Sequence, residues 1–244
     1  MGRILFLTGT GTDVGKTGLS LAILLWARER GLAPAYLKPV QCGTYPIGDP
    51  PREGGDADLV RALSGGIPAS VTYALPMPAS PHLAAERTGI GIDPVRLRRE
   101  AAEMAASAGL LVVEGAGGAA VPLDREGSTL AGLAKGLGAE TVLACAPGLG
   151  TLHHTLATAA WLRQAGIGPA GFAFCRRLAG EDPLEADNRR TLMDLSGIPF
   201  FGSVPFVAGL AAGRPLGLAE SAALWAPLAP ALDAWLAGSG PALS

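Results

Sequence analysis

The chain has 244 residues, of which 49% are hydrophobic and 16% are charged, and its formal net charge is −2. This length and composition predict a globular domain with a full-sized core and exclude a largely disordered chain. The small net charge indicates neither a nucleic-acid nor a membrane partner, and no apolar run approaches the length of a membrane span. The three cysteines, Cys42, Cys145 and Cys175, form no CxxC pair, which is typical of a reduced protein and predicts a cytoplasmic location.

The N-terminal stretch joins a strand, a glycine-rich loop and a helix. Residues 4–7 are an apolar run that predicts a buried strand, and residues 18–28 predict a helix. The loop between them, residues 8–17, ends in Gly-Lys-Thr, which in this setting indicates a phosphate-binding loop. Loop amides and the helix N-terminus attract phosphate, while Lys16 is placed to reach the β- and γ-phosphates and Thr17 to hold Mg²⁺.

The loop departs from the standard spacing of this motif. Four residues normally separate its first glycine from Gly-Lys-Thr, but Thr10 stands at that first position and Gly9 lies one residue earlier. The alternative interpretation is a glycine-rich turn that contains Gly-Lys-Thr by chance. The flanking strand and helix favour the phosphate-binding loop.

A second lysine ends the next predicted strand. Residues 34–38 predict a buried strand with Lys38 as its last residue, because Pro39 is expected to stop the ladder. Ligands of open α/β sheets gather at the carboxyl ends of strands, so Lys38 is expected to contact a phosphate or another anion. A solvated strand end is the alternative. Asp56 then opens a helix, either as a capping acid or as a carboxylate that faces a metal.

The middle of the chain carries one acid in a glycine-rich setting. Residues 66–92 contain several prolines and predict an irregular loop, and residues 93–108 predict a helix. An apolar strand then ends at Glu114 and is followed by the glycine-rich residues 115–118. In phosphate-loop proteins such an acid commonly orients Mg²⁺, and the glycines let a ligand approach the backbone closely. The alternative is an exposed acid at a strand end.

The remaining residues continue the alternation of strands and helices. Strands are expected over 141–146, 171–175 and 200–206, and helices over 128–138, 151–164, 183–196 and 221–237. This order predicts an α/β fold of the P-loop NTPase type, with a mostly parallel sheet and helices on both faces. The absence of an internal repeat or a long linker predicts a single domain over residues 1–244.

The combined motifs resemble the dethiobiotin synthetase family. The resemblance rests on the phosphate loop, Lys38-Pro39-Val40, the helix start at Asp56, Ser80-Pro81-His82, residues 114–118, and Gly150-Thr151 with His154-Thr155, and it covers roughly residues 3–207. It implies an ATP-dependent cyclo-ligase that forms C–N bonds in biotin biosynthesis. The implied reaction carboxylates 7,8-diaminononanoate with CO₂ through a carbamate and a mixed anhydride with phosphate. It yields dethiobiotin, ADP and phosphate.

The resemblance also implies roles for individual residues. Lys16 and Lys38 would be catalytic, and Thr17, Asp56 and Glu114 would bind Mg²⁺, with ATP as the co-substrate. The implied ATP site consists of Asp13, Val14, Gly15, Lys16, Thr17, Gly18, Asp56, Glu114, Gly115, Ala116, Gly117, Cys175, Arg176, Pro205, Phe206 and Val207. The implied substrate site consists of Thr12, Cys42, Ser80, Gly150, Thr151, Leu152 and His153. The start of the helix at 150–153 would come from the partner subunit of a homodimer.

Three residues depart from the family's pattern. Cys42 stands where Ser or Thr is usual near the substrate amines, and His153 stands where Asn is common. Cys175 stands where many members carry an Asn that recognises adenine, and a thiol is a much weaker hydrogen-bond partner.

Other functions of the phosphate-loop fold remain as alternatives. A non-enzymatic nucleotide switch of the partition-ATPase type carries a signature lysine five residues before the loop lysine, where this chain has Gly11. An amidotransferase of the cobyrinate synthase type needs a further glutaminase domain. A small-molecule kinase shares the loop but gives no reason for Lys38-Pro39-Val40 or for residues 114–118.

Overall fold

Seven parallel strands form one sheet in the order β3-β2-β4-β1-β5-β6-β7. The structure is a computed structural model that describes residues 2–44 and 55–238. Its strands are β1 Arg3–Gly9, β2 Pro34–Cys42, β3 Ala69–Leu75, β4 Leu110–Gly118, β5 Glu140–Cys145, β6 Pro169–Cys175 and β7 Phe200–Val204. The predicted parallel α/β sheet is therefore confirmed, and its extent over all of residues 1–244 stays a prediction.

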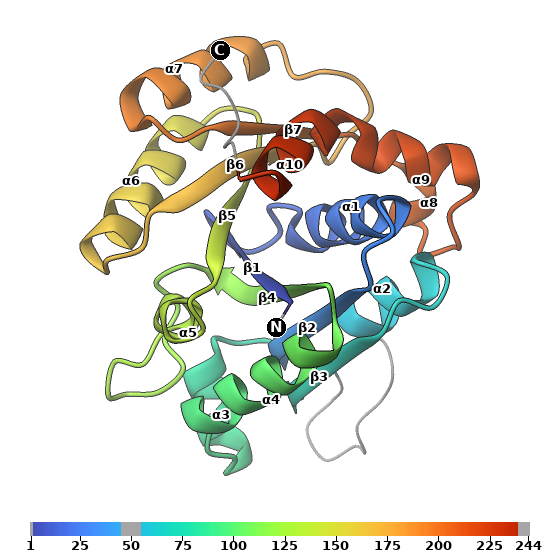
Figure 1. Cartoon of the computed structure of the whole chain (residues 1–244). Helices are drawn as coiled ribbons and strands as arrows, with labels where there is room; N and C mark the ends of the chain where they lie inside the picture. Colours follow the sequence, from blue (N-terminus) through green and yellow to red (C-terminus); the bar gives the residue numbers. More distant parts are fainter. Residues whose placement is uncertain (1, 45–54, 239–244) are drawn as a thin grey trace.

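Helices cover both faces of this sheet (Figure 1). They are α1 Lys16–Glu29, α2 Asp56–Leu63, α3 Pro81–Thr88, α4 Pro94–Ser107, α5 Leu130–Gly136, α6 Thr151–Gln164, α7 Glu185–Ser196, α8 Ala208–Ala211, α9 Leu218–Trp225, the 3₁₀ helix η1 Ala226–Leu228 and α10 Ala229–Leu236. One face packs on α1, α2, α9 and α10, and the other packs on α3 to α7. No helix within the described ranges is long and apolar enough to cross a membrane.

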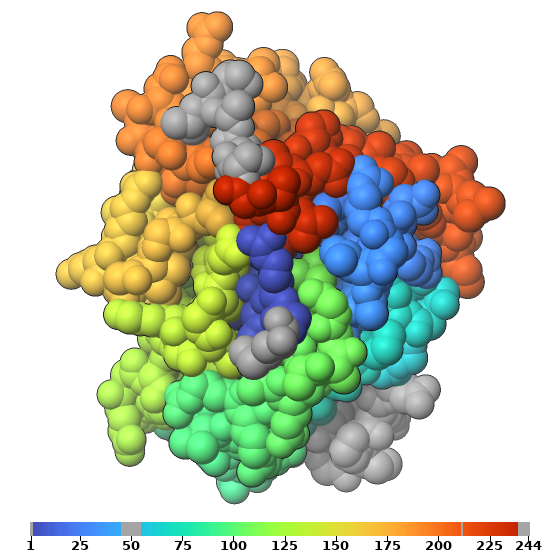
Figure 2. All heavy atoms as spheres, viewed as in Figure 1, coloured from blue at the N-terminus to red at the C-terminus, as the bar shows by residue number. Residues whose placement is uncertain are grey.

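The C-terminal helices are fixed against the first helix. Figure 2 shows the red C-terminal segment directly beside the blue α1. Trp26 donates to Asp233 Oδ1 at 2.9 Å, and Arg30 forms an ion pair with the same carboxylate at 2.7 Å. The single helix expected over 221–237 is wrong in detail, because a 3₁₀ turn that contains Pro227 separates α9 from α10.

The irregular loop expected over residues 66–92 is wrong. This stretch contains β3 on the edge of the sheet and α3 after it. The prolines border these elements rather than interrupt them, since Pro68 precedes β3 and Pro76 follows it. Pro81 occupies the first turn of α3, where its missing N–H costs nothing.

Pro39 does not end β2 as expected. The ladder between β2 and β4 stops at the pair Leu37 and Val113, so Pro39 needs no donor on that side. The ladder with β3 continues from Lys38 to Cys42 and passes over Pro39. Lys38 therefore lies inside β2, and Glu114 likewise lies inside β4, which runs on to Gly118.

Candidate functional site

The loop between β1 and α1 has the geometry of a phosphate-binding loop. It connects Gly9, the last residue of β1, to Lys16, the first residue of α1. Gly15 caps α1 with a left-handed φ of 92°, and a Cβ on it would lie 2.3 Å from Cys175 Cβ, so only glycine fits there. Lys16 Nζ donates to the carbonyl of Gly11 at 2.8 Å, which folds the lysine back along its own loop.

A pocket of about 920 Å³ opens beside this loop at the carboxyl edge of the sheet. Segments after β1, β2, β3 and β4 all contribute to it, as expected for an open parallel sheet. Predicted site residues that line it are Thr12, Asp13, Gly15, Lys16, Thr17, Gly18, Lys38, Cys42, Asp56, Ser80, Glu114, Ala116 and Gly117. The structure thus brings together the residues that the sequence associates with phosphate, metal and amine binding.

Lys38 sits between two carboxylates. Its Nζ lies 2.6 Å from Asp56 Oδ2, 2.7 Å from Glu114 Oε1 and 3.3 Å from the carbonyl of Gly115. Burial acts to lower the pKa of Lys38, but the charges of Glu114 and Asp56 outweigh it and raise the pKa above its ordinary value. Lys38 therefore stays a cation, and the alternative of a solvated strand end is wrong because only 4% of the residue is exposed.

Lys16 is the second buried cation of the pocket. Its pKa is lowered from the ordinary value, first by burial and then by the charge of Lys38. The ammonium groups of Lys16 and Lys38 are balanced by the carboxylates of Asp56 and Glu114, so attraction of a polyphosphate depends on the loop N–H groups and on a metal ion that the carboxylates would hold.

Glu114 is completely buried, so the alternative of an exposed strand-end acid is wrong. Its Oε1 accepts from Lys38 and, at 3.1 Å, from Thr17 Oγ1. Its Oε2 accepts from Ser20 Oγ at 2.6 Å and from the Tyr36 hydroxyl at 3.0 Å. Burial and the charge of Glu114 raise the pKa of Tyr36 well above its ordinary value, which keeps that hydroxyl protonated as a donor.

Sequence reasoning missed Ser20 and Tyr36. Spacing alone could have found them, because Tyr36 lies two residues before Lys38 and shares its face of β2. Ser20 lies three residues after Thr17 and therefore shares its face of α1.

The oxygen atoms around Thr17 fit a magnesium ion. Thr17 Oγ1 lies 3.3 Å from Asp56 Oδ1 and 3.1 Å from Glu114 Oε1, a set of hard oxygen donors that Mg²⁺ prefers. Within residues 2–44 and 55–238, no three His, Cys, Asp or Glu side chains form a metal cluster by themselves. A metal here would therefore depend on the Thr17 hydroxyl and on oxygens of a bound phosphate.

Asp56 uses its carboxylate in the pocket rather than as a cap. It is the first residue of α2, after the capping residue Gly55. Its backbone N–H donates to Gln41 Oε1 at 3.1 Å, while its carboxylate faces Lys38 and Thr17.

The amine end of the implied substrate site carries an uncharged thiol. Cys42 and Ser80 line the pocket together with Thr12. Burial raises the pKa of Cys42 to about 11, so the side chain is a neutral thiol at physiological pH and a weak donor.

The predicted residues at the start of α6 do not line the pocket of their own chain. These are Gly150, Thr151, Leu152 and His153. The Thr151 hydroxyl is buried and bonded to Thr155 Oγ1 at 3.3 Å, while His153 is exposed and Leu149 beside it is 97% exposed. At the helix start, Gly150 and His153 are therefore exposed on the outside of this chain, while Thr151 is buried and Leu152 packs against the core.

The predicted nucleotide residues at the ends of β6 and β7 do not line the pocket. Cys175 is buried against Gly15, and Arg176 is ion-paired with Glu185 at 2.8 Å and Glu181 at 3.1 Å. Val207 is buried and Phe206 is 37% exposed; neither they nor Pro205 line the pocket. Val14 and Gly115 belong to the lining segments without lining the pocket themselves.

Arg177, which sequence reasoning missed, does line the pocket. Two arginines follow the end of β6, and the sequence gives no sign of which one faces the site. Glu185 of α7 and Glu181 just before that helix hold Arg176, and this leaves Arg177 as the guanidinium that lines the pocket.

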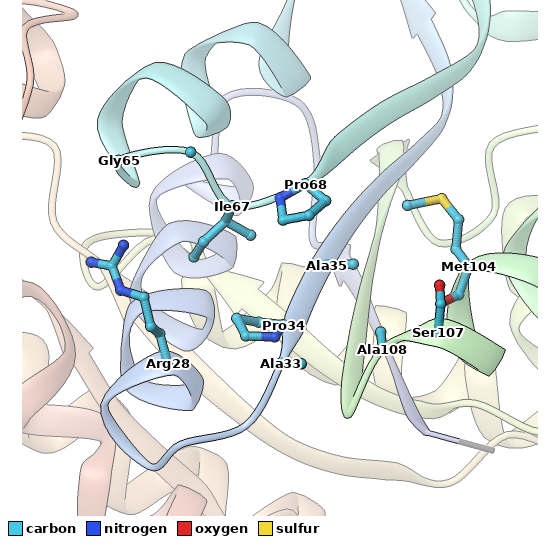
Figure 3. A pocket seen from close by; sticks show the side chains of 11 residues that line it. Arg28, Ala33, Pro34, Ala35, Gly65, Ile67, Pro68, Met104, Ser107 and Ala108 are labelled. Carbon is cyan, nitrogen blue, oxygen red and sulfur yellow. The ribbon is translucent and has the colours of Figure 1, made fainter.

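A second pocket, of about 500 Å³, lies at the opposite edge of the sheet (Figure 3). Its walls come from the end of α1, the amino ends of β2 and β3, and the end of α4. Arg28 is the one charged side chain among its described lining residues, and it donates to the carbonyl of Ser64. Its described lining places no acid or base beside the Ser107 hydroxyl, which donates to the carbonyl of Met104, so the chemistry belongs to the first pocket.

Comparisons with solved structures bear on the fold. MinD of Pyrococcus horikoshii, solved in complex with Mg-ADP, matches with a TM-score of 0.60 at 18% identity, covering 98% of this chain and 99% of that one. A ParA family ATPase of Chlorobium tepidum matches with a TM-score of 0.58 at 16% identity, covering 96% and 98%. Both likenesses show the fold of P-loop NTPases.

Sequence comparisons identify the family. A family model described as an AAA domain matches residues 3–214. The ATP-dependent dethiobiotin synthetase BioD of Streptomyces coelicolor is 38% identical over 231 residues, which are 94% of this chain and 93% of that relative. The protein of the same name from Rhodococcus jostii is 38% identical over 226 residues, or 89% and 93% of the two chains. The chain therefore belongs to the ATP-dependent dethiobiotin synthetase family.

Proposed function

We propose that this protein uses ATP to carboxylate 7,8-diaminononanoate with CO₂ and to close the product to dethiobiotin, releasing ADP and phosphate. The observation that supports it most is the convergence of two buried lysines, Lys16 and Lys38, on one pocket with the Thr17, Asp56 and Glu114 oxygens. Such an arrangement suits a reaction in which a carboxylate anion attacks a triphosphate. Family membership supplies the identity of the substrates.

The proposed chemistry has three steps. One amine attacks CO₂ and loses a proton, which gives a carbamate. A carbamate oxygen then attacks the γ-phosphorus and ADP leaves, and finally the second amine attacks the carbonyl carbon and phosphate leaves. The phosphoryl transfer brings a carbamate anion against the triphosphate, so positioning and neutralisation carry most of the catalysis.

The two lysines divide this neutralisation between them. Lys16, in the phosphate loop, would contact the β- and γ-phosphates. Lys38 lies deeper, against Asp56 and Glu114, and would hold the carbamate beside the phosphoryl group. Mg²⁺, held by Thr17, Asp56 and Glu114, would supply further positive charge at the phosphates.

The magnesium assignment gives a direct prediction. Glu114→Gln keeps the size of the side chain but removes its charge, so the Mg²⁺ concentration for half-maximal activity is expected to rise about tenfold or more. Glu126→Gln, on an exposed loop residue, is the matched control and keeps the wild-type dependence. An unchanged metal dependence in Glu114→Gln would remove Glu114 from the metal site.

Nucleotide choice gives a second prediction. The thiol of Cys175 is buried against Gly15 and is a weak hydrogen-bond partner. It is therefore expected to contribute little to the discrimination of one nucleotide base from another. ATP is expected to work, while GTP and CTP compete better than in a relative with Asn at this position. The measurement is kcat/KM for the three nucleotides in wild type and in Cys175→Asn. A preference for ATP above about 10³-fold that Cys175→Asn leaves unchanged would show that adenine is recognised elsewhere.

A homodimer is part of the proposal. Gly150 and His153 at the start of α6 are exposed and outside the pocket of their own chain, as they would be if this helix start served the pocket of a partner. Backbone N–H groups at Gly150–His153 would then receive the substrate carboxylate. We also propose the cytoplasm as the location, since Cys42, Cys145 and Cys175 are all free thiols.

A nucleotide switch is the second candidate, because MinD and ParA share the fold. Gly11 stands where those switches carry their signature lysine, and this favours the synthetase. The test is to supply the diamine, ATP, Mg²⁺ and ¹³C-bicarbonate and to analyse the products by mass spectrometry. Dethiobiotin labelled at one carbon is the expected product, and its absence with a folded, nucleotide-binding protein would refute the proposal.

A further inference from the structure

The two oxygens of Glu114 face different neighbours. Lys38 and Thr17 donate to Oε1, and Ser20 and Tyr36 donate to Oε2. A carboxylate offers about four lone-pair sites, so Ser20 and Tyr36 occupy both sites of Oε2, while a bound metal would take a site on Oε1 in place of the Thr17 donor. The side chain has no freedom to rotate without breaking a hydrogen bond.

Ser20 and Tyr36 cannot touch a ligand in the pocket. Both are fully buried, and neither lines the pocket, whereas Glu114, Thr17 and Lys38 do. Any effect of the two hydroxyls on the reaction must therefore pass through Glu114.

The positions of Tyr36 in β2 and Ser20 in α1 bring both hydroxyls to Glu114 Oε2. Tyr36 pairs with Val112 across the β2–β4 ladder, so Glu114, two residues further along β4, is its diagonal neighbour on the same face. Ser20 approaches from the first turns of α1, which covers that face of the sheet. Oε2 is thus held by side chains of two separate elements, the strand β2 and the helix α1.

We propose that Ser20 and Tyr36 are positioning residues that fix the Glu114 carboxylate so that Oε1 is presented to the metal and the phosphates. This inference rests on the proposed function, which gives Glu114 to Mg²⁺. Outer hydrogen bonds to a ligating carboxylate are typically worth 10- to 100-fold in metal affinity. The dependence of nucleotide binding on Mg²⁺ is therefore expected to weaken by about that factor when either hydroxyl is removed.

The experiment measures ADP binding by calorimetry over a range of Mg²⁺ concentrations, without diamine or bicarbonate. Tyr36→Phe and Ser20→Ala each remove one hydroxyl and are expected to shift the Mg²⁺ midpoint upward by about 10- to 100-fold, with ADP affinity restored at saturating Mg²⁺. Tyr73→Phe is the matched control, because the Tyr73 hydroxyl accepts from the backbone N–H of Asp93 at 3.1 Å and lies beside Arg96, far along the chain from the loop. It is expected to keep the wild-type midpoint.

A double-mutant cycle separates positioning from a merely structural role. In the Glu114→Gln background, Tyr36→Phe is expected to add no further shift, because its effect acts through the carboxylate. A shift that persists in that background would overturn the proposal, and so would unchanged midpoints in the single variants or a wild type whose ADP binding ignores Mg²⁺. If Tyr36→Phe fails to fold, Ser20→Ala carries the same test. Normal Mg²⁺-dependent binding with no dethiobiotin formed would refute the proposed reaction alone.

Discussion

Replacement of Lys38 by alanine is expected to lower kcat by about 10²–10³ or more. The ammonium of Lys38 is buried 2.6 Å from Asp56 and 2.7 Å from Glu114. Without this ammonium, the pocket has one fewer positive charge to offset the repulsion between the carbamate, the two carboxylates and the triphosphate. The measurement is steady-state formation of dethiobiotin at saturating ATP and Mg²⁺.

Controls distinguish lost chemistry from lost structure. Removing one partner of a buried ion pair commonly costs about 3–5 kcal/mol, so Lys38→Ala is expected to unfold more easily while keeping the sheet and core. Activity should be compared at a temperature where circular dichroism shows both proteins folded. Lys135→Ala is the matched control, because Lys135 is exposed and bonded to the carbonyl of Ala165. Near-normal turnover in Lys38→Ala would remove this lysine from the reaction.

The second large effect is expected for Lys16→Ala. Lys16 is the first residue of α1 and directly follows the phosphate loop. Among the described contacts, its ammonium donates only to the carbonyl of Gly11. Its loss is expected to lower kcat by about 10²–10³ or more, because charge develops on the phosphates that it would contact. Weaker ADP binding should accompany the lower rate, whereas Lys38→Ala should keep most of its ADP affinity. Calorimetry with ADP separates the two lysines.

The stability of Lys16→Ala shows whether its loss of activity comes from lost chemistry or from lost structure. A hydrogen bond from a charged group contributes about 1.5–3 kcal/mol, so Lys16→Ala is expected to be no less stable than Lys38→Ala. Wild-type kcat together with wild-type ADP affinity would contradict the assignment of Lys16.

Elements with a strong hydrophobic pattern could be predicted from the sequence. The strands around residues 4–7 and 110–113 are continuous apolar runs, which buried parallel strands require. The edge strand β3 was missed because Ser70 and Thr72 interrupt its apolar pattern and prolines surround it. An edge strand is buried less and is therefore less constrained by hydrophobicity.

The site residues that belong to recognisable sequence motifs could be predicted. Lys16, Thr17, Lys38, Asp56 and Glu114 were all expected near one another, and one pocket contains them. The hydroxyls on Glu114 Oε2 were not expected, because serine and tyrosine inside apolar elements carry no signal by type. Arg176 and Arg177 could not be told apart, because the choice depends on how the chain after β6 folds back to place Glu181 and Glu185 against Arg176.

The central claim is that one pocket couples ATP cleavage to ring closure. The most direct test measures phosphate and dethiobiotin released over the same time course, with the diamine, bicarbonate and ATP each omitted in turn. The proposed function predicts equimolar phosphate and dethiobiotin and negligible release of either when any substrate is missing. Sustained release of phosphate from ATP without the diamine, and without dethiobiotin, would contradict it and would point to a nucleotide switch.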